Sequence, residues 1–222
     1  MSQAEIQAGG IVINGVERND PLQVFDRYKN PLPLRNFWQN QAAFLVCGGP
    51  SLNKISYHRL SERGVISLGV NNVAGYVPVT GFFFSDPPEK FHHGIFRDGK
   101  MIKFVTQSKM NRHIRIKDSD GNFYYDTKTL VKDCPGVVTF SRRCWHTPEA
   151  FLTDPAATWG NNKNGSRQTS RPRVICTMLI GIRLLHYLGC SRVYLLGVDF
   201  FMKYDKLSSE GNLGYAFNQS RD

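Results

Sequence analysis

The chain has 222 residues, of which 41% are apolar and 21% are charged, and its 28 Lys and Arg against 18 Asp and Glu give a formal net charge of +10. This length predicts one large domain, or a domain with a small appendage, with enough apolar residues to build a substantial core. No segment approaches the roughly 18 to 20 uninterrupted apolar residues of a membrane span, so the composition excludes an integral membrane protein.

The net charge indicates which ligands the protein attracts, and the cysteines indicate the redox compartment in which it resides. The surplus of Lys and Arg raises the local concentration of anions, which favours phosphate-bearing ligands. The five cysteines form no C-x-x-C pair and are odd in number, so neither a zinc site nor a disulfide framework is predicted. The first ten residues lack the pattern of a secretory signal, and we therefore expect a reduced, cytoplasmic protein without a bound metal.

The chain divides by pattern near residue 40. Residues 1–40 are polar and rich in Asn, Pro and Arg, which predicts an irregular arm or a small hairpin that packs through Phe37 and Trp38. Residues 41–222 alternate strand and helix signals, which predicts a nucleotide-binding α/β domain with a mostly parallel sheet flanked by helices. The expected elements are strand 42–47, helix 51–63, strand 65–70, strand 81–85, a short helix near 87–94, strand 102–106, strand 136–140, helix 172–188 and strand 191–196. The polar residues 111–130 and 155–171 are expected to form long loops.

A glycine turn ends the first of these strands. In FLVCGGPSL, Gly48 and Gly49 allow backbone N–H groups to approach a ligand, and Pro50 leads into a helix with Ser51 as its expected N-cap. The unpaired N–H groups of that helix would point into the same space, which is the outline of a phosphate or nucleotide site. The segment matches neither G-x-G-x-x-G nor a P-loop, and a plain tight turn that needs glycine explains it equally well.

Polar residues also end three other apolar strands. Asn71 and Asn72 follow one strand, and an asparagine suits a ribose hydroxyl, a base edge or a turn. Asp86 follows the next strand, either as a site carboxylate or as the cap of a short helix. Asp199 follows the last strand, either as a site acid or as a residue that ties down its own loop.

The segment before the long helix carries positive charge. Ser170, Arg171 and Arg173 place a hydroxyl and two guanidinium groups at the expected helix N-terminus. Fixed donors and the helix dipole act together on an anion there, so a phosphate contact is predicted, with a solvated helix start as the alternative.

In these segments the sequence resembles the sialyltransferase-like group, which includes bacterial α-2,3-sialyltransferases and MptE-like proteins with a GxGPSL turn. The resemblance is carried by VCGGPSL, by GVNN, by ICTMLIGIRLLHYLGCSRVYLLGVDFF and by GYAFNQ. It implies a Rossmann-like fold, a variant of GT-A, and a nucleotide-sugar donor, a CMP-sugar or UDP-sugar. It also implies that Tyr215 assists the leaving phosphate, whereas Phe201 replaces a second tyrosine of the family. In the family, further helices with the proposed general base follow the GYAFNQ segment, whereas the sequence here ends at Asp222. Three alternatives follow: a natural short form, a truncated chain, or a base that lies elsewhere in the sequence.

The leading expectation is a metal-independent glycosyltransferase that moves a sugar from its nucleotide to a glycan or another hydroxyl acceptor, without a further cofactor. An MptE-like diphosphokinase is the alternative enzyme, and it would need Mg²⁺ held by clustered carboxylates, with Asp86 and Asp199 as the pair. A phage-type protein that binds or modifies DNA, with nucleic acid along the basic residues 100–117, is a third reading. A member of the group without catalytic activity is a fourth.

Overall fold

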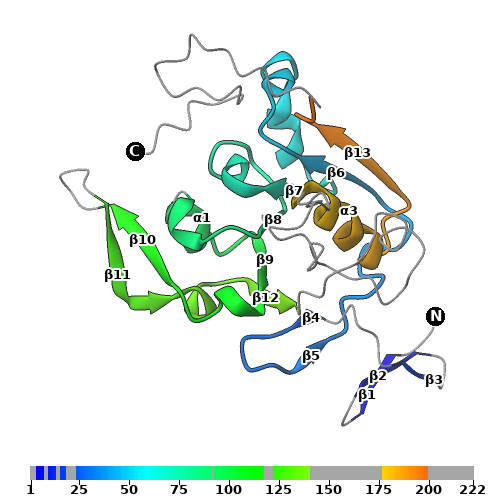
Figure 1. The fold of residues 1–222 in the computed structure, drawn as a ribbon. Helices are drawn as coiled ribbons and strands as arrows, with labels where there is room; N and C mark the ends of the chain where they lie inside the picture. The colour runs from blue at the N-terminus through cyan, green and yellow to red at the C-terminus, as the bar shows by residue number, and fades with distance from the viewer. Residues whose placement is uncertain are drawn as a thin grey trace, which may run out of the picture.

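The computed structural model describes residues 4–7, 10–13, 16–18, 24–91, 93–117, 123–140 and 177–199. Its centre is an eight-stranded mixed sheet with strand order β13-β6-β7-β8-β9-β12-β4-β5 (Figure 1). The strands from β13 to β12 are parallel to their neighbours, and β4 and β5 are antiparallel additions at one edge. The expected mostly parallel sheet is thereby confirmed. Its strands are β4 (Val24–Phe25), β5 (Pro31–Leu32), β6 (Ala42–Val46), β7 (Ile66–Val70), β8 (Gly81–Phe84), β9 (Ile102–Thr106), β12 (Val137–Phe140) and β13 (Arg192–Leu196).

Burial explains why the central strands are so apolar. All residues of β7 and β8 are buried, because both faces of these strands are covered. Strands in that position read as continuous apolar runs rather than as an alternating pattern. The sequence ISLGV and the sequence GFFF fit this environment, and both strands were expected at these places.

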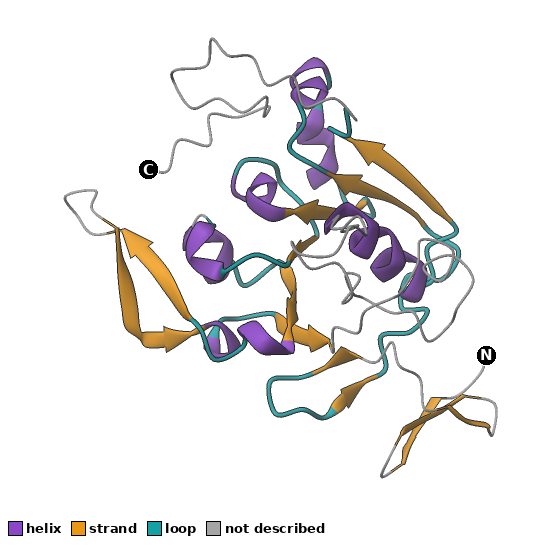
Figure 2. Cartoon of the chain, in the orientation of Figure 1, coloured by secondary structure: helices purple, strands orange, loops and turns teal. Residues whose placement is uncertain are grey.

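Two layers cover the sheet. On one face, the helix α3 (Thr177–Tyr187) packs Ile180 and Leu184 into a core with Leu45, Leu68 and Phe83. The opposite face is covered by short helical segments: η1 (Pro50–Lys54), η2 (Tyr57–Ser61), η3 (Asn71–Gly75), η4 (Pro88–Lys90) and α1 (His93–Arg97). Helices are therefore sparse in the part of the chain that the structure describes (Figure 2).

The predicted helix 51–63 is wrong in type. The segment forms the two five-residue 3-10 helices η1 and η2, and Ile55 between them is extended. Its Asn, Ser, Ile and Tyr residues have low helix propensity, and Ser and Asn compete for backbone hydrogen bonds. The short helix expected near 87–94 is split between η4 and α1.

The long helix agrees with its prediction where it is described. α3 covers Thr177–Tyr187, and Gly189 follows it with φ of 90°, the conformation expected of a glycine after a helix C-terminus. The expected first turn, residues 172–176, lies outside the described residues.

The boundary expected near residue 40 does not separate two units. β4 and β5 belong to the eight-stranded sheet, and Trp38 packs against the α3 face of the core. The N–H of Trp38 donates to the carbonyl of Leu188, whereas Phe37 stays 58% exposed and is not the anchor that was expected. The preceding strands β1 (Ala4–Gln7), β2 (Gly10–Ile13) and β3 (Val16–Arg18) form a separate three-stranded antiparallel sheet.

Residues 111–130, expected to form a loop, contain a two-stranded antiparallel ribbon. β10 (His113–Lys117) pairs with β11 (Phe123–Leu130), and the ribbon projects from the main sheet (Figure 1). Buried Ile114 and a 2.7 Å ion pair between Arg112 and Glu89 attach its base to the domain. None of the helices among the described residues is long and apolar enough to cross a membrane.

Candidate functional site

The strand order turns back at β6. The chain proceeds from β6 through β7, β8, β9 and β12 on one side, and β13 then pairs with β6 on its other side. Because these strands are parallel, the segments that follow β6, β7, β8 and β13 leave the sheet at the same edge. In open α/β sheets, ligands bind in the crevice outside the carboxyl ends of the strands, at the point where the strand order reverses.

Hydrogen bonds join the ends of β6 and β13 along this edge. The N–H of Cys47 donates to the Leu196 carbonyl at 2.8 Å, and the N–H of Gly49 donates to the Gly197 carbonyl at 2.8 Å. One turn further on, the N–H of Ser51 donates to Oδ2 of Asp199 at 2.9 Å, across 148 residues of sequence. The glycine turn after β6 and residues 197–199 after β13, called the GVD segment below, are therefore one structural unit.

Glycine is required in this unit because the two strand ends approach closely. A Cβ on Gly49 would lie 2.3 Å from Oδ2 of Asp199 and 2.5 Å from the Gly197 carbonyl oxygen. A Cβ on Gly197, whose φ is +65°, would lie 2.1 Å from the Cys47 carbonyl oxygen. The alternative of a tight turn that needs glycine for structural reasons therefore explains Gly49. Gly48, the preceding residue, is half-buried.

Ser51 and Asp199 have roles that the sequence did not predict. The N-cap position of η1 is Gly49, with Pro50 as its first residue, and no side chain caps the helix. The predicted Ser51 cap is therefore wrong, since Ser51 lies inside η1. Asp199 ties down a loop, as one alternative stated, but the loop is that of the distant glycine turn. No sequence signal links the two residues.

Asn71 and Asn72 lie at the same edge, after β7. Asn71 is the first residue of η3 and has a left-handed backbone with φ of 57°. Its Oδ1 atom is buried and has no hydrogen-bond partner among the described residues. Asn72 follows as a half-buried residue. A buried acceptor without a hydrogen bond, such as Asn71 Oδ1, lowers the stability of the folded state unless a donor reaches it.

Asp86 lies at this edge but away from Asp199. β8 is three strand spacings from β13, roughly 14 Å at about 4.8 Å per strand. The Asp86 carboxylate is 53% exposed and lies 4.0 Å from the Lys90 ammonium, and the N-cap of η4 is Pro87 rather than Asp86. The strand order therefore does not bring the two carboxylates to one Mg²⁺ ion, and no cluster of three metal-ligating side chains occurs in the described ranges.

A contact that sequence reasoning missed joins the end of β8 to α3. The hydroxyl groups of Ser85 and Thr177 lie 3.0 Å apart. This contact brings the start of the described part of α3 to the same edge of the sheet. The predicted residues Ser170, Arg171 and Arg173, which precede α3, and Tyr215 lie outside the described residues.

The basic stretch 100–117 does not form one surface. Lys103 is fully buried, and its ammonium donates to the main-chain carbonyls of Asp98, Met101 and Pro135. Burial lowers the pKa of this lysine below its usual value. Phe104 is also a core residue. The alternative in which the whole stretch lines a phosphate backbone is thus wrong for β9. Among its other described basic residues, Lys100 and Arg112 are exposed and Lys109 is half-buried.

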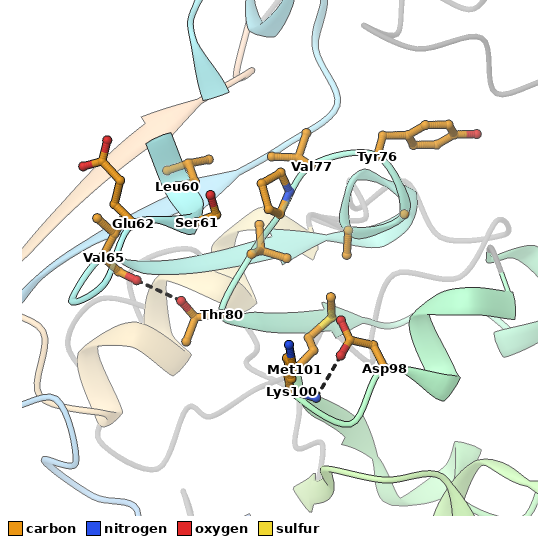
Figure 3. Close-up of a pocket in the computed structure, with 14 residues that line it drawn as sticks. Leu60, Ser61, Glu62, Val65, Tyr76, Val77, Thr80, Asp98, Lys100 and Met101 are labelled. Atoms are coloured by element: carbon orange, nitrogen blue, oxygen red, sulfur yellow. Dashed lines mark hydrogen bonds between the residues drawn. The ribbon is translucent and has the colours of Figure 1, made fainter. Parts of the chain in front are cut away.

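A groove of about 450 Å³ lies at the opposite edge of the sheet (Figure 3). Residues before the starts of three strands line it, namely Val65, Thr80 and Met101, together with the charged Glu62 and Asp98. The Thr80 hydroxyl donates to the Val65 carbonyl at 2.9 Å and links two of the lining residues (Figure 3). None of the residues predicted as site residues lines this groove.

Comparison of the chain with protein-family models, with curated proteins and with solved structures found no match.

Proposed function

We propose that the chain is a transferase that binds a nucleotide-activated donor, a CMP-sugar or UDP-sugar, at the carboxyl ends of β6, β7 and β13. One observation carries the proposal: the glycine turn and the GVD segment are hydrogen-bonded to each other where the strand order turns back. This is the place at which open α/β sheets bind their ligands. The sequence resemblance to sialyltransferase-like proteins, with its Rossmann-like GT-A variant, supports the same location.

The chemistry of the described edge suits a nucleoside. Asn71 offers a buried acceptor without a partner, and an amide group can accept from and donate to a base edge or a ribose hydroxyl. The leaving phosphate would be stabilised by Arg171, Arg173 and Tyr215, which the resemblance and the charge pattern assign. Stabilising the negative charge that develops on the leaving group is usually the largest contribution to such a transfer.

The described carboxylates favour this reaction over the diphosphokinase alternative. A Mg²⁺-dependent transfer of pyrophosphate needs oxygen ligands that converge on one ion. Asp86 and Asp199 are separated by three strand spacings, roughly 14 Å, and Asp86 is near Lys90 instead.

A thermal-shift panel tests the proposal. The protein is heated with CMP, UDP, GDP, ATP and their sugar conjugates, and a cytidine or uridine nucleotide should raise the melting temperature, because a ligand that binds only the folded state stabilises it. If no nucleotide raises the melting temperature, the proposal is refuted.

Asn71→Ala should weaken the thermal shift. Asn40→Ala is the matched control, since Asn40 also has a left-handed backbone, with φ of 62°, but precedes β6 at the opposite edge. Both substitutions remove the same side chain from the same backbone conformation. A nucleotide response that falls equally in both variants would contradict the placement of the site.

A further inference from the structure

Apart from the N–H of Gly48, the backbone donors of the glycine turn are hydrogen-bonded within the part of the chain that the structure describes. The N–H groups of Cys47, Gly49 and Leu52 donate to main-chain carbonyls, and that of Ser51 donates to Asp199. Pro50 has no N–H group. A turn that cradles phosphate must present several N–H groups to the ligand. This turn has hydrogen-bonded those groups to its own chain.

The group that accepts from Ser51 is itself an anion. Oδ2 of Asp199 lies 2.9 Å from the Ser51 nitrogen, and it occupies the position from which a phosphoryl oxygen would accept the same N–H. The close approach requires glycine at position 49, because a Cβ on Gly49 would lie 2.3 Å from that oxygen. A phosphate brought to the turn would therefore meet a carboxylate of like charge at the place where it would accept from the Ser51 N–H.

The neighbouring strand end presents an acceptor as well. Oδ1 of Asn71, after β7, is buried and lacks a partner among the described residues. The ends of β6, β7 and β13 thus include two acceptor oxygens, one on Asp199 and one on Asn71. This arrangement suits a ligand group that donates hydrogen bonds, such as a hydroxyl or an amino group.

We propose that Asp199 is a specificity residue that excludes phosphoryl groups from the glycine turn. The inference rests on the proposed function and refines it: the turn receives an uncharged, hydrogen-bond-donating part of the donor, and the donor's phosphate binds elsewhere along the edge. Asp199 acts by occupying the Ser51 amide and by repelling a second anion.

Titration with inorganic pyrophosphate tests this exclusion without using any nucleotide. Binding is measured by calorimetry at constant ionic strength for the wild type, Asp199→Asn and Asp199→Ala. The wild type should bind weakly, and Asp199→Ala should bind about tenfold more tightly or better, because the Ser51 N–H is freed and the like charge is removed. Asp199→Asn should lie between them, since its amide oxygen can still accept from Ser51.

Asp86→Asn is the matched control for charge. Asp86 lies at the same edge of the sheet, and its substitution changes the net charge of the protein by the same amount. It should leave pyrophosphate binding unchanged. An equal gain in Asp86→Asn and Asp199→Asn would overturn the proposal, because the gain would then reflect net charge alone.

Two further outcomes separate this inference from the proposed function. If the wild type already binds pyrophosphate as tightly as Asp199→Ala, the exclusion is refuted, whether or not nucleotides bind. If the Asp199 variants gain affinity but no nucleotide stabilises the wild type, the exclusion stands and the proposed function fails. Should Asp199→Ala not fold, Asp199→Asn still decides the question, because it keeps an acceptor for Ser51.

Discussion

Replacing Gly49 with alanine should pull apart the ends of β6 and β13. The new Cβ would lie 2.3 Å from Oδ2 of Asp199 and 2.5 Å from the Gly197 carbonyl oxygen, whereas real Cβ atoms essentially never come within 3.0 Å of such atoms. The backbone of Gly49, with φ of −71° and ψ of 153°, is allowed for alanine. The cost therefore comes from the contact alone and not from backbone strain.

The magnitude follows from the two hydrogen bonds that the separation weakens. The bond from Gly49 to Gly197 is neutral and is worth about 0.5–1.5 kcal/mol, and the bond from Ser51 to Asp199 involves a charge and is worth about 1.5–3 kcal/mol, less for its partial exposure. Replacing glycine by alanine returns about 0.4–1 kcal/mol through the unfolded chain. We expect a net loss of about 1–3 kcal/mol in the free energy of unfolding.

Guanidinium denaturation of the wild type, Gly49→Ala and a control measures this loss. Gly99→Ala is the control, because its Cβ would meet no atom closer than 4.0 Å, and it should change stability by less than about 0.5 kcal/mol. In an Asp199→Ala background, Gly49→Ala should cost less, which gives a coupling energy of about 1 kcal/mol. A Gly49→Ala protein as stable as the Gly99→Ala protein would refute the reasoning.

Two other predictions concern buried ionisable groups. Lys103→Met should lower the free energy of unfolding, measured by urea denaturation, by about 2–4 kcal/mol, because three main-chain carbonyls lose a charged donor. Lys100→Met, at an exposed position, should have little effect. Equal stability of the two variants would contradict the structural role of the Lys103 ammonium. Burial raises the pKa of Cys134 and of Cys190 from 9.0 to about 11, so the folded state keeps protons that the unfolded state releases, and stability that is complete below pH 9 should fall between about pH 9 and 11. Burial lowers the pKa of Lys103, so this group acts in the opposite sense. The variant with both cysteines replaced by alanine should show a flatter alkaline decline in melting temperature than the wild type. An identical decline would argue against the two thiols as its source.

The positions of the parallel strands could be predicted because their signal is local. A strand covered on both faces needs a run of apolar residues, and turn residues must follow where it leaves the sheet. β9 occupies the predicted range, and β7 and β13 begin one residue later than expected. The same reasoning placed Asn71 and Asp199 at strand ends.

The type of the short helical segments could not be predicted in the same way. Residues 51–63 begin with a helix start signal and are followed by Gly64, yet extended Ile55 divides them into two 3-10 helices. Helix propensity is a weak preference that tertiary packing can override. In this segment the deciding contact is the burial of Leu52 and Leu60 against one face of the sheet. The predicted phosphate site depended on an α-helix that the segment does not form.

By itself, the sequence determined which segments are buried strands and which polar residues end them, because burial and turn chemistry are written in neighbouring residues. Only the tertiary structure decided which strand ends meet, since β13 pairs with β6 through residues about 150 positions apart in the sequence, such as Arg192 and Ala42. That pairing places the Asp199 carboxylate on the Ser51 amide and separates Asp86 from Asp199. Contacts of β9 with the residues before it and with Pro135 bury Lys103 among carbonyls. The glycine turn is therefore held closed by an acid from the far end of the described chain, and no local pattern around Gly49 could have predicted it.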